Sequence, residues 1–267
     1  MQALMESVRT SGVSHDILTF SDEPLANVAS CEMDKSIDMD FKQYWKFRYL
    51  QKIHEMDYDL FVFIDSDHYF VRKPDKDFSE IIGEDPWHSF LESPINSETT
   101  RRPDWWGVIN PVMTQIYRDF GVAQNTVYST NGGFWMCKKK FMKQAASTGF
   151  LFRDYQKGLG LDLPEEVAIA VISHMFSMDY SNRFHQRYMD IWASEWTGVL
   201  QDRVPNGSSW EFQEYMTGAK STVNPAIVHA MRSKNALVNI GKQIFESTKA
   251  TRSFVPWEKA KGMGDES

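Results

Sequence analysis

Two aspartates separated by one serine follow the most apolar short run of the sequence. Residues 60–67 read LFVFIDSD, so Asp65 and Asp67 come directly after five apolar residues. Side chains at i and i+2 of an extended segment point the same way, so both carboxylates are expected to converge at a strand end. Two such carboxylates suit a divalent ion such as Mn²⁺ or Mg²⁺, which can bridge a diphosphate and stabilise it as a leaving group. The alternative is a solvated turn, because Asp-x-Asp is a common sequence.

A predicted helix over residues 41–57 supplies cations upstream of the aspartates. Lys42 and Lys46 project on the same side as its apolar stripe, which places two ammonium groups facing inward. Inward ammonium groups need an anionic partner, either a nucleotide phosphate or the carboxylates of Asp65 and Asp67. In the alternative interpretation, the two lysines extend past the apolar stripe to reach solvent.

The pattern of elements predicts an α/β fold. The apolar run 60–64 does not alternate with polar residues, which favours a strand covered on both faces in a mostly parallel central sheet flanked by helices. In open sheets of this kind, ligands bind beyond the carboxyl ends of the strands. Residues 85–111 look rich in loops, and Asn131-Gly132-Gly133 look like a tight turn within a strand. Further helices are expected at 2–11, 111–120, 140–156 and 163–176, and further strands at 15–20 and 226–231.

Composition limits the class of protein. The chain has 267 residues, a net charge of −7 and a pI near 5.5, which argues against non-specific binding of nucleic acid. Two cysteines imply no disulfide framework and a reducing compartment. No run approaches the roughly 18 apolar residues of a membrane span, and the first residues are too polar for a signal peptide. We therefore expect a cytoplasmic protein with one domain over residues 1–250 and a mobile tail over 251–267.

The order of motifs resembles the GT-A glycosyltransferases, most closely the glycogenin-like and galactosyltransferase-like retaining enzymes. The similarity covers roughly residues 15–240 and rests on a helix with basic residues followed by YDLFVFIDSD, STNGGFWMCKKKF, LPEEVAIA and VHAMRSKN. It implies a Rossmann-like fold that transfers a sugar from a nucleotide-diphosphate donor to an acceptor hydroxyl with Mn²⁺ or Mg²⁺. The donor, the acceptor and the stereochemical outcome stay open.

The resemblance implies specific roles for residues that bind the metal and the donor. Asp65 and Asp67 would contact the metal and the diphosphate, and His229 would complete the metal shell. Lys234 would contact the diphosphate. The segment Asn131, Gly132 and Gly133 would shape the pocket for the donor sugar. By themselves, His229 would more often be structural and the glycines would more often form a hairpin turn.

Acidic and aromatic residues supply candidates on the acceptor side. Glu165 and Glu166 begin a predicted helix, where they either complement the helix dipole or, as the family resemblance implies, act as a base or positioning group facing the sugars. Motif spacing favours Glu166. Trp105 and Trp106 lie in a polar loop and are predicted to stack either on an acceptor sugar or on the core.

Two features depart from the family pattern. The family usually opens with an apolar strand that carries base-binding contacts, and no such strand precedes the helix at 2–11 here. This absence fits a late start, a trimmed segment or a lost strand. The family's Lys-Pro-Trp after the late histidine is replaced by RSKNAL.

Two other classes of protein fit parts of the pattern. One is a nucleotide-sugar or carbohydrate-binding protein on the same fold without catalysis. The other is a phosphatase of the haloacid-dehalogenase type, in which the first Asp of an Asp-x-Asp pair is the nucleophile. That class normally carries Thr or Val shortly after the motif, whereas this sequence reads DSDHYF.

Overall fold

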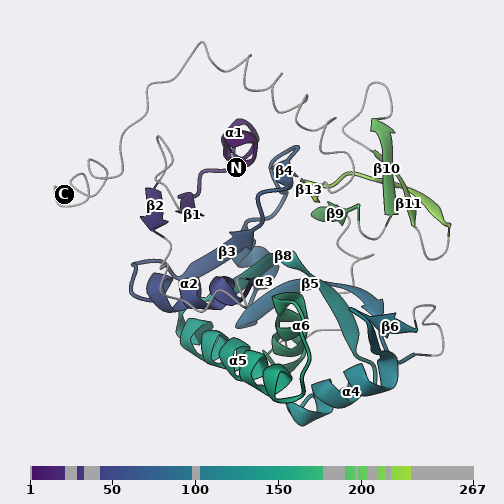
Figure 1. The fold of residues 1–267 in the computed structure, drawn as a ribbon. Coiled ribbons are helices and arrows are strands. Elements are labelled where there is room, and N and C mark those ends of the chain that lie inside the picture. The colour runs from purple at the N-terminus through teal and green to yellow at the C-terminus, as the bar shows by residue number, and fades with distance from the viewer. Residues whose placement is uncertain are drawn as a thin grey trace.

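The computed structural model describes residues 2–21, 29–32, 43–97, 103–176, 190–195, 198–203, 210–214 and 218–229. The candidate donor-binding residues Lys42 and Lys234 and the tail at 251–267 lie outside these ranges. The described residues form a mixed α/β structure (Figure 1). None of its helices within these ranges has the length and apolar character needed to cross a membrane.

The helices mostly lie where the sequence predicts them, and the strand at residues 60–64 matches its expected bounds. The helices are α1 (Gln2–Thr10), α2 (Trp45–Ile53), α3 (Phe78–Ile82), α4 (Asn110–Asp119), α5 (Lys139–Gly158) and α6 (Glu165–Phe176). The strands are β1 (Leu18–Ser21), β2 (Ala29–Glu32), β3 (Leu60–Ile64), β4 (His68–Phe70), β5 (Trp87–Pro94), β6 (Asp104–Trp105), β7 (Val108–Ile109), β8 (Tyr128–Lys138), β9 (Trp192–Ser194), β10 (Gly198–Arg203), β11 (Trp210–Glu214), β12 (Lys220–Val223) and β13 (Ile227–His229).

A three-stranded sheet has the order β3-β8-β5, and its residues belong to both of the larger apolar clusters. Strand β8 alternates its side chains between two apolar clusters, as an extended segment must. Trp135 and Cys137 join the cluster that contains residues of α2, α5 and α6, whereas Phe134 and Met136 join the cluster with residues of α1 and α3. Helices therefore cover both faces of this sheet.

The expectation of a mostly parallel sheet is not met among the described strands. β3 and β5 both pair with β8 in antiparallel fashion, and only the β1–β2 and β9–β13 pairs are parallel. A run of apolar residues reports that both faces of a strand are covered, but it carries no information about the direction of the neighbouring strand. Helices on both faces give an antiparallel strand the same apolar pattern.

Two local predictions in the middle of the chain are wrong. Asn131, Gly132 and Gly133 lie inside the continuous strand β8 rather than in a turn, and neither glycine has a positive φ. The segment at 85–111, expected to be mainly loop, contains β5 and the β6–β7 hairpin. Histidine, serine and glutamate among the apolar residues of β5 hid its strand character.

A second three-stranded sheet, β4-β13-β9, brings distant parts of the chain together. β13 pairs antiparallel with β4 and parallel with β9, and His229 stands opposite His68 in the register. Because β4 follows β3 after a short turn, this pairing carries the end of β13 to the end of β3. A third sheet has the order β10-β11-β12.

Candidate functional site

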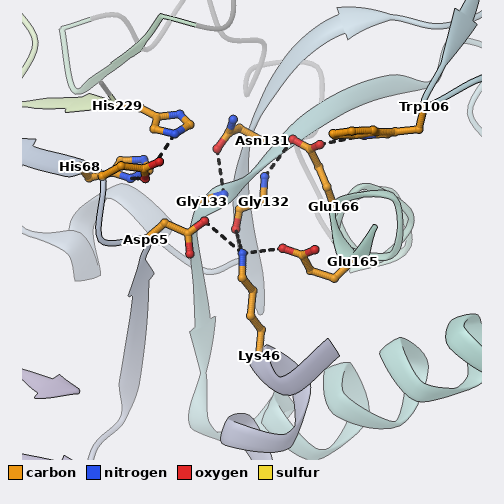
Figure 2. Close-up of polar contacts among 11 residues, drawn as sticks. Lys46, Asp65, His68, Trp106, Asn131, Gly132, Gly133, Glu165, Glu166 and His229 are labelled. Carbon is orange, nitrogen blue, oxygen red and sulfur yellow. Dashed lines mark hydrogen bonds and ion pairs between the residues drawn. The ribbon is translucent and has the colours of Figure 1, made fainter. Parts of the chain in front are cut away.

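The turn between β3 and β4 carries the Asp-Ser-Asp motif. The amide of Asp65 donates a hydrogen bond to the carbonyl of Gly133 at 2.8 Å, and the amide of His68 donates to the carbonyl of Asp65 at 3.2 Å. The chain therefore leaves the extended conformation after Ile64 and turns over residues 65–67. Both aspartates belong to this turn, and Figure 2 shows Asp65 beside the glycine segment of β8.

Three side chains that could bind a metal meet next to this turn, and we call them the imidazole cluster: Asp67, His68 and His229. The Oδ1 atom of Asp67 lies 3.4 Å from Nε2 of His229 and 3.4 Å from Nδ1 of His68. One ligand atom from each residue lies within 4.8 Å of the others. Asp67 and His229 lie close together, as expected, although they are far apart in the sequence. The sequence analysis did not predict that His68 would belong to this group.

Burial sets the protonation of the imidazole cluster. Burial lowers the pKa of His68 to about 4, against the opposing effect of the neighbouring Asp67 carboxylate. For Asp67, burial alone would raise the pKa, but the contacts with His229 and His68 outweigh it and hold the pKa well below its usual range. His68 is therefore neutral and Asp67 ionised near neutral pH, which are the forms in which these side chains bind metal.

Asp65 belongs to a second group, the lysine cluster: Lys46, Asp65 and Glu165. Nζ of Lys46 lies 3.2 Å from Oδ2 of Asp65 and 2.5 Å from Oε1 of Glu165, and it donates a hydrogen bond to the carbonyl of Gly132 at 3.1 Å. These contacts occupy the three N–H donors of the ammonium group. The structure thus matches the interpretation in which a carboxylate of the motif is the anionic partner of Lys46.

The charge of Lys46 is held in place by its partners. Burial would lower its pKa, but the carboxylates of Glu165 and Asp65 outweigh burial and raise the pKa. The ammonium group also lies 4.8 Å from the centroid of the Phe63 ring. Lys46 therefore links α2 to both the Asp-Ser-Asp turn and the start of α6.

Glu166 points away from Lys46 and contacts the β6–β7 hairpin. Its Oε1 accepts a hydrogen bond from the amide of Gly132 at 3.1 Å, and its Oε2 accepts one from Nε1 of Trp106 at 2.9 Å (Figure 2). Burial raises the pKa of Glu166 well above its usual value, and the carboxylates of Glu92 and Glu165 raise it further. This carboxyl group therefore holds its proton to an unusually high pH.

The two adjacent tryptophans have different surroundings. Trp105 packs in the core with 7% of its surface exposed, so it offers little area to an acceptor and the core interpretation holds for it. Trp106 is 48% exposed and adopts a positive φ of 54°, the only such value among the non-glycine residues that the structure describes. Sequence could not separate the two, because which one faces the core depends on the β6–β7 turn.

The glycine segment of β8 lies next to both polar clusters. A Cβ atom at Gly133 would lie 2.7 Å from Cε1 of His68 and 3.2 Å from Oδ2 of Asp65. A Cβ atom at Gly132 would lie 3.2 Å from Oε1 of Glu165. Asn131 is buried, and its Oδ1 accepts a hydrogen bond from the amide of Gly133 at 2.8 Å. The glycines are needed for close approach of side chains rather than for a turn.

Comparisons with known proteins add little to this geometry. No protein-family model matches the sequence, and no curated protein is significantly similar to it. Among solved structures, the chain is similar to a crystal structure of an active-site mutant of LgtC, at 12% sequence identity and a TM-score of 0.49. That alignment covers 97% of this chain and 94% of the LgtC chain. A TM-score this low carries no argument about fold or function, so the function has to be argued from the site.

Proposed function

We propose that this protein is a metal-dependent glycosyltransferase of the GT-A type, which moves a sugar from a nucleotide-diphosphate sugar to an acceptor hydroxyl. The observation that carries the proposal is the placement of a metal-binding group and a proton-holding carboxyl group on either side of one glycine segment. Gly133 adjoins His68 of the imidazole cluster, and Gly132 donates its amide hydrogen bond to Glu166. The two groups therefore adjoin consecutive residues of β8.

The imidazole cluster is the part of the site that fits a cation. Asp67 supplies an ionised carboxylate and His68 a neutral imidazole, and His229 points its Nε2 at the same carboxylate oxygen. A divalent cation bound there, Mn²⁺ or Mg²⁺, would neutralise the diphosphate of the donor and stabilise it as a leaving group. Asp65 lies in the same turn as Asp67, and its ion pair with Lys46 links this turn to α2.

Glu166 is the candidate for contact with the reacting sugars. Its two hydrogen bonds, from Gly132 and Trp106, fix the carboxyl group beside the glycine segment. A carboxyl group with a raised pKa keeps its proton more readily than an ordinary one, so it can donate a hydrogen bond to a sugar hydroxyl or exchange a proton with it. Glu165 is committed to Lys46 instead, so of the two neighbouring glutamates Glu166 is the better candidate.

The exposed face of Trp106 fits an acceptor that contains a sugar. Its indole N–H is held by Glu166 while almost half of its surface is open to solvent. Aromatic rings of this kind present an apolar face on which a pyranose ring can pack. We propose a glycan or another hydroxyl compound as the acceptor, bound between Trp106 and the glycine segment.

A binding protein without catalysis is the second candidate, and one observation favours it. The three N–H donors of Lys46 are all used by protein groups, so this lysine would have to break an internal contact to reach a donor phosphate. A protein that only binds carbohydrate has no phosphate to contact and needs no such rearrangement. Transfer of sugar, or slow hydrolysis of the donor, separates the two candidates.

Thermal shift with nucleotides and nucleotide sugars tests the proposal, because a ligand of the native state raises the melting temperature. UDP, GDP, CMP and their sugars are compared with and without Mn²⁺, and the ligand that stabilises the protein is then tested for hydrolysis and transfer. Glu166→Gln should retain the metal-dependent shift and lose most of the turnover. Glu84→Gln, at an exposed position, is the matched control. Absence of any metal-dependent shift would overturn the proposal.

A further inference from the structure

His68 is a fully buried histidine whose two ring nitrogens have no hydrogen-bond partner among the residues that the structure describes. Its Nδ1 lies 3.4 Å from Oδ1 of Asp67. Burying a polar group without a hydrogen bond is unfavourable, and a phenylalanine would fill the same space without that cost. The imidazole at this position therefore calls for a partner that the described part of the chain does not supply.

His229, in contrast, is oriented by a neighbour. Its Nδ1 lies 3.0 Å from the hydroxyl oxygen of Ser194 in the adjacent strand β9. This contact fixes the direction of the ring, with Nε2 on the side of the Asp67 carboxylate, 3.4 Å from its Oδ1. A second hydrogen bond of this kind is how proteins fix the tautomer and direction of a metal-binding histidine.

The two imidazole rings are stacked, with centroids 4.2 Å apart and planes inclined by 4°. A cation bound by an imidazole nitrogen lies close to the plane of the ring, so one cation cannot lie in both planes while the rings are parallel. One ring has to turn for both to bind. His68 is the ring that can, because no hydrogen bond holds it and because Gly133 puts no side chain beside its Cε1 atom.

We propose that His68 turns to become a ligand of the cation, so that the site is built from two imidazoles and one carboxylate. Nitrogen ligands favour later transition metals, and affinities for such sites rise from Mn²⁺ to Co²⁺ and beyond. Mg²⁺ prefers oxygen ligands. The imidazole cluster therefore selects Co²⁺ or Zn²⁺ over Mg²⁺, with Mn²⁺ between them. This inference rests on the proposed function only in using the same cation site, and it is tested with metal alone.

The experiment measures binding of Co²⁺ and Mg²⁺ to the full chain by calorimetry, and follows Co²⁺ by its visible absorption, which responds to nitrogen ligands. Wild type should bind Co²⁺ at least about tenfold more tightly than Mg²⁺. His68→Phe keeps an aromatic ring against His229 and should weaken Co²⁺ binding by at least about tenfold, with a changed spectrum. His88→Phe, at another fully buried histidine on β5, is the matched control and should bind Co²⁺ like wild type.

A second variant covers the case in which His68→Phe does not fold. His68→Gln offers an amide oxygen in place of the imidazole nitrogen, so the preference for Co²⁺ over Mg²⁺ should fall by about tenfold. Unchanged Co²⁺ affinity and spectrum in either His68 variant would overturn the ligand role of His68 and leave the proposed function standing. A wild-type preference for Mg²⁺ would overturn the selectivity. If wild type bound neither metal, both the inference and the metal dependence of the proposed function would fail.

Discussion

The imidazole cluster and the lysine cluster both lie beside the glycine segment of β8, yet internal contacts satisfy only one of them. In the lysine cluster, one ammonium group contacts two carboxylates and a carbonyl, so every charge has an internal partner. In the imidazole cluster, an ionised carboxylate faces two imidazoles, and His68 has no hydrogen bond. The first links parts of the fold to one another, and the second supplies the ligands of the proposed cation site.

The two aspartates of the Asp-Ser-Asp motif therefore belong to different clusters. Asp65 is paired with Lys46, whereas Asp67 faces His68 and His229. The sequence predicted that both carboxylates would converge, on the rule for residues two apart in an extended segment. That rule does not apply, because residues 65–67 form a turn closed by the hydrogen bond from the His68 amide to the Asp65 carbonyl. Asp65 is not a member of the group of three potential ligands.

The largest expected effect comes from removing the carboxylate of the imidazole cluster. Asp67→Asn should weaken Mn²⁺ binding by about a hundredfold or more, because it removes the only charged ligand of the set. The fold should survive, since the amide fills the same space. Titration with Mn²⁺ followed by electron paramagnetic resonance measures the loss. Asp57→Asn, at an exposed position, is the control, and equal affinities in the two variants would contradict the ligand role of Asp67.

The lysine cluster should respond in the opposite way, through stability rather than metal affinity. Lys46→Met removes the ammonium group that pairs with Glu165 and Asp65. The side chain of Glu165 is only 8% exposed, whereas that of Asp65 is 38% exposed. Breaking a buried ion pair costs about 3–5 kcal/mol, and the exposure of Asp65 puts the expected loss near 3 kcal/mol. Urea unfolding without metal measures it, with Lys52→Met in the same helix as the control.

A contact between Lys46 and a donor phosphate would add a second signature. The affinity of Lys46→Met for the donor would then fall more at low than at high ionic strength, because salt screens the contact. A loss of stability with no change in donor affinity at any salt concentration would assign Lys46 to the fold alone.

Paired glycine substitutions sharpen the comparison between the clusters. Gly133→Ala places a Cβ atom 2.7 Å from Cε1 of His68, so it should lower metal affinity and cost about 1–3 kcal/mol through overpacking. Gly132→Ala meets Glu165 and Glu166 at 3.2–3.3 Å, so its effect should be smaller and should spare the metal. Gly158→Ala has nothing within 4 Å and serves as the control. Loss of metal affinity in Gly132→Ala but not in Gly133→Ala would contradict the arrangement.

The sequence was most informative where a signal is local. The apolar stripe of α2 and the Pro-Glu-Glu start of α6 predicted helices that are present, and the apolar run at 60–64 predicted β3 within its observed bounds. Strand direction was not predictable, since it depends on which strand is the neighbour. The helix start gave Glu165 and Glu166 the same candidate roles, and only motif spacing favoured Glu166. Successive helical residues point about 100° apart, so the two side chains have different neighbours in the structure.

The imidazole cluster depends on information that no single segment carries. His229 was assigned from the family resemblance, and its meeting with Asp67 requires the pairing of β13 with β4. His68 follows the motif directly in the sequence, and a histidine beside Asp-x-Asp could have been tested as a ligand. Its burial and its lack of a hydrogen bond, which single it out, are visible only in the folded chain.

The smallest expected effect on the metal site comes from replacing His174. This buried histidine has a hydrogen bond at each ring nitrogen, so it serves as a reference for His68. Its Nδ1 bonds to the Ala170 carbonyl at 2.8 Å, and its Nε2 accepts the Tyr128 amide at 3.1 Å. Burial lowers its pKa from 6.5 to about 4. Because the folded state resists protonation, the stability that neutral His174 contributes is complete above about pH 6.5 and is lost as the pH falls toward 4.

Replacing this histidine should therefore flatten the pH dependence of stability without touching the metal site. His174→Gln should be less stable than wild type at pH 7.5, but its melting temperature should decline less between pH 6.5 and 4, since one titrating group contributes at most about 1.4 kcal/mol per pH unit. Melting curves in EDTA measure this, with His54→Gln at a partly exposed position as the control. Co²⁺ should bind His174→Gln as it binds wild type, because a histidine with both nitrogens satisfied has none to offer a metal. A parallel decline in variant and wild type, or a loss of Co²⁺ binding, would remove the distinction between a buried histidine that the fold completes and one that awaits a ligand.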